Sequence, residues 1–496
     1  MKSLRLFLVT STILFLAVLP AFAQSNLSLS AKEYASASGK TITGDEGTLT
    51  VPENRANPAS DSITIHFVRL HGTGNNKQAP VIYLAGGPGS SCTWQASDPR
   101  SLETWEPYLE LGDVVLLDQR GTGAGSERTL YIWQGDLPND FLADEEVALQ
   151  HLQRVQDAAL EAFDERGVDL DGYTTLENAR DMDGLRRALG YDQWKLYGFS
   201  YGTHLGQAYL KYFGEHVDRA LLVGTEGPNH TYKLPLAMDV QFQKLSLLAK
   251  ADPTVNGDVP DVWALYQEVA RQLDKQPAEV TVTNPLTRSD MTMLVGSFGL
   301  NLILRLDIGD ASDLPVIPRL LYQIKQGNYD PLQWFVQKRI GLMLGVSGMA
   351  STMDAASGIT PSRRQRIDEE SRTSLFASVV NPRLEQAWPS PDLGDEFRAP
   401  LVTDVPTLFL SGTLDFNTPP YQAEEVRWGY ANSHHIIVRN AGHEQVLTHP
   451  GATDTIIRFL QGEDVSDVTM VHPSLRFIPV EGSDSEGWHP CLGSRK

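Results

Sequence analysis

The stretch that most constrains this chain is residues 194–203, where an apolar run meets a G-x-S-x-G pattern centred on Ser200. The run predicts a buried strand, the pattern a sharp turn, and the residues that follow a helix. Gly198 and Gly202 suit the turn, because its strained serine leaves room only for small neighbours. We expect the Ser200 hydroxyl above a sheet edge, with the N–H of Tyr201 facing any oxyanion formed there. A lone G-x-S-x-G is more often an ordinary glycine-rich turn, so this interpretation needs partners elsewhere.

Apolar runs on both sides of this turn predict a buried sheet. Residues 47–52 and 62–68 alternate like strands, which is consistent with an antiparallel start. A helix-like segment at residues 178–190 ends on a C-cap glycine just before the serine strand. Strand, helix, strand, turn and helix form the order of a doubly wound, mostly parallel α/β sheet. The other strand candidates are residues 80–85, 114–118, 219–224, 406–412 and 435–438.

The alternation of strands and helices stops between residues 230 and 400. Helical patterns dominate this segment, as in residues 262–270. We interpret residues 230–400 as an inserted, mainly helical cap, which divides the core into residues 24–229 and 401–465. Residues 466–496 form a polar C-terminal tail.

Three polar residues, each just after a predicted strand, occur in the order Ser200, Asp415 and His443. The carboxyl ends of parallel strands share one edge, so residues remote in sequence meet there. Taken singly, Asp415 fits a turn residue and His443 a loop histidine. Taken together, their order is the one expected of an α/β-hydrolase with a serine, histidine and aspartate triad.

A glycine-rich loop, residues 86–91 (GGPGSS), follows the predicted strand at residues 80–85. Such a loop lets backbone N–H groups approach a ligand closely, although a plain tight turn explains it equally well in isolation. A functional role for this loop is favoured because a serine hydrolase of this architecture takes its second oxyanion donor from it.

As a set, these motifs resemble the prolyl and tripeptidyl aminopeptidase family of serine peptidases. The resemblance implies Ser200 as nucleophile, Asp415 and His443 as its triad partners, and the backbone of Gly87 and Tyr201 as oxyanion donors. The motifs are residues 86–89 (GGPG), 118–121 (DQRG), 198–203 (GFSYGT), 412–415 (GTLD) with 418–419 (TP), and 442–443 (GH).

The sequence departs from this family at the glycine loop, where Ala85 replaces the histidine of many relatives, and in a cap without cysteines. Substrate details of the cap therefore transfer poorly. We expect a serine exopeptidase that releases N-terminal residues or short peptides. A carboxylic-ester hydrolase with the same triad is the alternative, because the triad specifies acyl transfer and not the leaving group. A non-catalytic binding protein with this fold is a third.

An enzyme that trims N-termini must hold a protonated amine, and a desolvated carboxylate is the natural partner. Glu226 follows the predicted strand at residues 219–224, and Asp354 lies in the cap. Both are candidates for substrate binding. The plainer interpretation makes each a solvated loop acid or a helix cap.

The first 23 residues have the pattern of a cleavable secretory signal. Lys2 and Arg5 precede a largely apolar run at residues 6–19, and an A-x-A pattern ends at Ala23. This run is shorter than the ~20 residues that a membrane-spanning helix needs, so we favour a signal over an uncleaved anchor. The mature protein is expected to be secreted or periplasmic.

The chain is strongly acidic, with 62 acidic against 41 basic residues and a formal net charge of −21. Such a surface repels phosphate backbones and anionic lipid, so no nucleic acid and no stable membrane association are expected. Short peptides are the partners that the family resemblance implies. No H-E-x-x-H pattern suggests a metal, and no cofactor is expected. Export would permit a bridge between Cys92 and Cys491, the only cysteines. Trp488 and Cys491 are the only obvious anchors of the tail.

Overall fold

The computed structural model describes residues 26–74, 78–123, 126, 129–307, 312–382 and 387–481. The predicted signal segment, Trp488 and Cys491 lie outside these residues, and so does any bridge from Cys92 to Cys491.

A nine-stranded sheet forms the centre of the described chain, in the spatial order β1-β2-β3-β5-β4-β7-β8-β12-β13. The first three strands pair antiparallel, and β3 also runs antiparallel to β5, whereas all later neighbours are parallel. The predicted antiparallel start and mostly parallel sheet are therefore confirmed. The strands are β1 (Leu27–Ala35), β2 (Thr41–Pro52), β3 (Ser62–Leu70), β4 (Val81–Leu84), β5 (Val114–Leu117), β7 (Trp194–Phe199), β8 (Val217–Val223), β12 (Thr407–Gly412) and β13 (Ser433–Val438).

Helices cover both faces of this sheet, because side chains along each central strand point alternately to two apolar cores. In β5, Val115 and Leu117 are buried in the core beneath α3 (Thr175–Leu189) and α4 (Tyr201–Phe213). Val114 and Leu116 of the same strand belong to the opposite core, with α1 (Pro99–Trp105) and α16 (Ala452–Gln461). This doubly wound arrangement was predicted from the order of the elements and is confirmed.

Local signals set the ends of α3, the helix before the serine strand. The Thr174 hydroxyl accepts a hydrogen bond from the N–H of Glu177 at the start, and Gly190 adopts φ 76° at the end. The predicted C-cap glycine at residue 190 is therefore confirmed.

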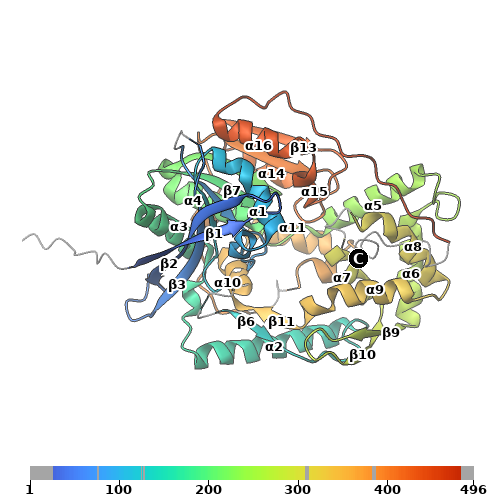
Figure 1. Ribbon diagram of the computed structural model, residues 1–496. Coiled ribbons are helices and arrows are strands. Elements are labelled where there is room, and N and C mark those ends of the chain that lie inside the picture. Colours follow the sequence, from blue (N-terminus) through green and yellow to red (C-terminus); the bar gives the residue numbers. More distant parts are fainter. Residues whose placement is uncertain are drawn as a thin grey trace, which may run out of the picture.

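The segment at residues 230–400 is mainly helical, and most of its helices lie on the side of the molecule away from β1, β2 and β3 (Figure 1). Its helix at Gly348–Ser357 instead packs into the core of the central sheet through Met349 and Met353. It also contains a hairpin of β9 (Ala278–Thr283) and β10 (Asp290–Val295), while β11 (Gly345–Ser347) pairs with β6 (Tyr131–Trp133). Its helices are α5 (Pro235–Ala251), α6 (Val262–Lys275), α7 (Ser297–Asp307), α8 (Ile317–Lys325), α9 (Asp330–Arg339), α10 (Gly348–Ser357), α11 (Pro361–Ser371), α12 (Ala377–Val380) and α13 (Gly394–Arg398).

The apolar core of this segment extends beyond residues 230–400. Phe141 and Leu142, just before α2 (Glu145–Glu165), are buried in it, and so are Phe477 and Val480 of the C-terminal tail. These two tail residues are anchors that the sequence analysis did not identify, because isolated apolar residues in a polar stretch produce no periodic pattern.

Two further helices, α14 (Pro420–Arg427) and α15 (Gln445–Thr448), follow β12 and β13.

Candidate active site

The turn between β7 and α4 holds Ser200 in a strained backbone conformation, with φ 54° and ψ −125°. Its N–H donates to the carbonyl of Val223 at 2.9 Å, which ties the turn to the neighbouring strand β8. A Cβ on Gly202 would lie 1.9 Å from the carbonyl oxygen of Leu84, and one on Gly198 would lie 2.6 Å from the carbonyl oxygen of Gly202. The turn therefore closes against β4 only because both positions are glycine.

The carboxylate of Asp415 and the imidazole of His443 meet beyond the ends of β12 and β13. Asp415 Oδ2 lies 2.8 Å from His443 Nδ1. The other carboxylate oxygen, Oδ1, accepts the backbone N–H groups of Asn417 and Thr418, each at 2.8 Å. Asp415 is fully buried and His443 is 4% exposed. These contacts fix both the carboxylate and the ring that it faces.

Two neighbours that the sequence analysis did not assign complete this arrangement. The Thr418 hydroxyl donates to Asp415 Oδ2 at 2.7 Å and lies 3.1 Å from His443 Nδ1. Gly224, directly after β8, has φ 62°, and a Cβ there would lie 2.8 Å from His443 Cε1. The ring of His443 therefore occupies space that any other residue at position 224 would fill. A glycine at the end of a predicted strand was the only sequence signal for this role.

The electrostatics of the pair favour an ionised carboxylate beside a basic imidazole. Burial lowers the pKa of His443, but the charge and hydrogen bond of Asp415 raise it by more, so the pKa lies above its usual value. Burial raises the pKa of Asp415, yet the charge of His443 and the hydrogen bonds from His443 and Thr418 bring it below its usual value. The carboxylate holds the proton on Nδ1, which leaves Nε2 as the basic nitrogen.

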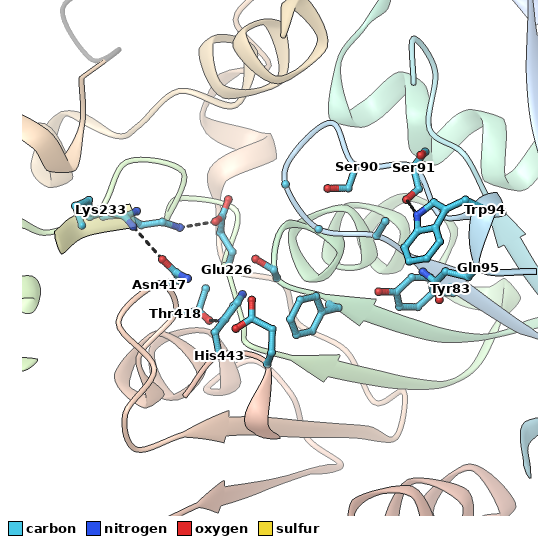
Figure 2. Close-up of a pocket in the computed structure, with 17 residues that line it drawn as sticks. Tyr83, Ser90, Ser91, Trp94, Gln95, Glu226, Lys233, Asn417, Thr418 and His443 are labelled. Carbon is cyan, nitrogen blue, oxygen red and sulfur yellow. Dashed lines mark hydrogen bonds and ion pairs between the residues drawn. The ribbon is translucent and has the colours of Figure 1, made fainter. Parts of the chain in front are cut away.

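A cavity of about 510 Å³ opens over these groups, and both Ser200 and His443 line it. No hydrogen bond joins the two side chains among the described residues, and such contacts often close only when substrate is bound. The full lining is Tyr83, Ala85, Gly86, Gly87, Ser90, Ser91, Trp94, Gln95, Phe199, Ser200, Glu226, Lys233, Arg305, Asn417, Thr418, His443 and Glu444 (Figure 2).

The two backbone positions predicted to bind an oxyanion lie next to the serine. A Cβ on Gly86 would lie 3.0 Å from Ser200 Cβ, so the glycine loop passes directly beside the serine, and Gly87 lines the cavity. Tyr201 is the first residue of α4, where N–H groups lack a partner within the helix. Its ring is buried, and its hydroxyl contacts Thr175 and Met353. Only the backbone of Tyr201 is therefore placed to serve the cavity.

Of the two acids predicted to bind substrate, one lines the cavity. Glu226 is 7% exposed and forms an ion pair with Lys233, as Figure 2 shows. Lys233 contacts Oε2, and the second oxygen, Oε1, has no hydrogen-bond partner in the described part of the chain. Asp354 lies in α10 and is not among the cavity-lining residues. Lys233, just before α5, and Arg305, in α7, were not identified from sequence, because single cations have no motif.

The remaining predictions on metals, membranes and cysteines concern other parts of the molecule. Within the described ranges, no group of three or more His, Cys, Asp and Glu side chains could hold a metal ion. None of the helices in those ranges is long and apolar enough to cross a membrane. Cys92 is buried, and its thiol donates to the carbonyl of Leu117 at 3.2 Å. Burial raises the pKa of this thiol, so it stays protonated.

Residues 79–450 match the family model described as alpha/beta hydrolase fold. The chain belongs to this family. It is 30% identical over 212 residues to the tripeptidyl aminopeptidase of Streptomyces lividans. This alignment covers 40% of this chain and 38% of that protein. It is 30% identical to the serine protease Hip1 of Mycobacterium tuberculosis (strain ATCC 25618 / H37Rv) over 37% of this chain and 36% of that protein.

A third relative, the proline iminopeptidase of Xylella fastidiosa (strain 9a5c), is 25% identical over 32% of this chain and 36% of its own length. These matches confirm the predicted fold and the predicted resemblance to peptidases of the prolyl and tripeptidyl aminopeptidase type. Each alignment covers little more than a third of the relative, so the activity of the whole protein is a separate question.

Proposed function

We propose that this chain is a secreted or periplasmic serine exopeptidase that releases N-terminal residues or short peptides. The observation that carries the proposal is the cavity lined by both Ser200, on its strained turn, and His443, which is paired with Asp415. Similarity to three proteins named as peptidases supports a peptide as the substrate.

In the proposed reaction, Ser200 Oγ attacks the substrate carbonyl while His443 Nε2 accepts the serine proton. Asp415 holds the imidazole in the required tautomer and stabilises its charged form. The N–H groups of Gly87 and Tyr201 stabilise the negative oxygen that develops. His443 then gives its proton to the leaving amine, which leaves an ester between Ser200 and the acyl group. Water attacks this ester while His443 accepts a proton from the water, and the proton passes to Ser200 Oγ as the carboxylic acid product departs.

Glu226 is the proposed anchor for the free N-terminal amine. Lys233 engages only one of its carboxylate oxygens, so Oε1 remains for a substrate ammonium. Such a charge-assisted contact is strong in a site from which water is largely excluded. Asp354 is the weaker candidate, because it does not line the cavity.

A fluorophosphonate probe tests the nucleophile. We expect the probe to label the mature protein at Ser200 and to leave the Ser200→Ala variant unlabelled. Mass spectrometry of the labelled peptide identifies the serine. Labelling at another residue, or none at all, would contradict the proposed role of Ser200.

Turnover of matched substrates separates a peptidase from an ester hydrolase. Aminoacyl amides with a free amine, the same amides with an acylated amine, and simple acyl esters are compared by kcat/KM. The proposal predicts preference for the free-amine amides. Efficient turnover of simple esters, with no turnover of amides, would assign the chain to ester hydrolysis. N-terminal sequencing of the exported protein tests the cleavage site after Ala23.

A further inference from the structure

The cavity contains a guanidinium whose charge is not balanced by a contacting carboxylate. Arg305, in α7 of the inserted segment, lines the cavity and is partly buried. Its Nη1 donates to the side-chain oxygen of Asn417 at 2.9 Å. In the part of the chain that the structure describes, this neutral amide is its only hydrogen-bond partner, and no carboxylate lies within ion-pair distance.

Two other cations of the same segment are paired with carboxylates, whereas Lys244 donates to the backbone carbonyl of Thr413. Arg339 lies 2.8 Å from Asp307, and Lys233 contacts Glu226. Removing a cation from water without a counter-charge is unfavourable, so such groups in folded proteins are usually paired. Arg305 has no such counter-charge among the described residues, and an anion from outside the chain would supply one.

The two carboxylates whose charges act on the pKa of Arg305 already have their own partners. Burial lowers the pKa of Arg305, while the charges of Asp415 and Glu226 act in the opposite direction. Asp415 is bound by His443 and Thr418, and Glu226 by Lys233. An arginine remains protonated in such surroundings, so the cavity presents a fixed positive charge.

We propose that Arg305 binds a carboxylate of the substrate, so that the enzyme prefers peptides with an acidic side chain near the free N-terminus. This inference rests on the proposed function. A guanidinium with free N–H groups matches a carboxylate in planar geometry and binds it through two parallel hydrogen bonds.

The position of Arg305 in the cavity assigns this carboxylate to the acyl side of the scissile bond. Figure 2 shows Lys233, which is paired with Glu226, and Asn417 on one side of His443, and Tyr83, Trp94 and Gln95 on the other. Arg305 bonds Asn417, so it belongs to the end of the cavity that holds Glu226. If the substrate amine binds Glu226, the residues at that end precede the bond that is cut.

Two pairs of peptides test the proposal. The first pair differs only by Glu or Gln at an acyl-side position, which changes a charge with almost no change in shape. The second pair differs only by a free or amidated C-terminus, which tests the other source of a substrate carboxylate. Each pair is assayed with the parent enzyme, Arg305→Gln, Arg305→Lys and the control Arg372→Gln, which removes the same charge from an exposed residue after α11.

We expect the parent to favour the Glu peptide over the Gln peptide by about tenfold or more in kcat/KM, the range typical of a charge-assisted hydrogen bond. Arg305→Gln should abolish this preference, Arg305→Lys should retain part of it, and Arg372→Gln should leave it unchanged. An equal loss on both peptides would mean that Arg305 only positions Asn417. If the enzyme discriminates only between the free and the amidated C-terminus, the recognised carboxylate is the C-terminal one, beyond the bond that is cut. Either result overturns the proposal.

Binding to Ser200→Ala protein, measured by calorimetry with the same Glu and Gln peptides, separates this inference from the proposed function. Preferential binding of the Glu peptide, lost in the Ser200→Ala and Arg305→Gln double variant, supports the subsite even if no peptide is cleaved. Equal binding of both peptides overturns the subsite even if the enzyme proves to be an exopeptidase.

Discussion

The two walls of the cavity are built in different ways. One wall is the carboxyl edge of the sheet, where Ser200, Asp415 and His443 follow three strands and backbone hydrogen bonds hold the serine turn and the carboxylate. The other wall comes from residues 230–400 and contributes the side chains of Lys233 and Arg305. The edge has a geometry that many contacts determine together, whereas the opposite wall depends on single charged side chains.

This difference suggests a division of work. Reaction chemistry needs groups fixed to within a fraction of an ångström, which strand ends and tight turns provide. Substrate selection needs charges that complement a ligand, and helices can supply these without a fixed backbone motif. Substitutions at the sheet edge should therefore lower kcat, while substitutions in the opposite wall should change substrate preference.

The largest effect is expected from Ser200→Ala at the sheet edge. Without the nucleophile, only binding and the oxyanion donors remain, so kcat should fall by about 10⁴-fold or more. Steady-state kinetics on a free-amine peptide measure this loss, and circular dichroism checks the fold. Activity within tenfold of the parent would remove Ser200 from the reaction.

Asp415→Asn should lower kcat by about 10⁴-fold, because the amide no longer fixes the imidazole tautomer or stabilises its charge. The pH profile should move as well. In the parent, Asp415 raises the pKa of His443, so activity rises with pH through a pKa above the usual ~6.5 as the imidazole loses its proton. Without that charge, burial lowers the pKa, and the rising limb shifts to lower pH.

Asp404→Asn is the matched control for this profile, because it removes a carboxylate that is exposed. Its kcat and the rising limb of its pH profile should equal those of the parent. If the chemical step is rate-limiting and the rising limb of the Asp415→Asn pH profile is not shifted, another group is the base.

Gly224→Ala tests how tightly the edge is packed. The added Cβ would meet the His443 ring at 2.8 Å, and φ 62° disfavours alanine. Under the proposed mechanism, displacing the His443 ring by about 1 Å should lower kcat by about 10²-fold. Gly257→Ala is the control, since a Cβ there meets nothing within 4 Å. Similar kcat values for the two variants would mean that the edge tolerates movement of His443.

The smallest effect is expected from Glu226→Gln, beside the inserted segment. The amide loses the charge that holds a substrate ammonium, so KM for free-amine peptides should rise about tenfold, with little change for N-acylated ones. Asp354→Asn should affect neither, because Asp354 does not line the cavity. Equal effects of Glu226→Gln on both kinds of substrate would place the amine anchor elsewhere.

Much of the sheet could be predicted because strands buried on both faces consist of continuous apolar runs in the sequence. The run at residues 114–118 became β5, and the alternation at residues 62–68 became β3. Strand β1 was not predicted, since most of its side chains are exposed and its short Leu-Ser-Leu-Ser alternation lies in a polar stretch. Phe477 and Val480 of the tail were missed because their burial depends on contacts remote in sequence.

By itself, the sequence determined the turn around Ser200, since two glycines flanking a serine between an apolar run and a helix allow few other conformations. It also determined that Asp415 and His443 follow strands of the same sheet. Only the tertiary structure decided that Gly224 leaves space for the imidazole, that Lys233 neutralises Glu226, and that Arg305 enters the cavity with a neutral partner. Backbone conformation follows from local sterics, whereas the balance of charges in a cavity depends on side chains that meet only after the chain has folded.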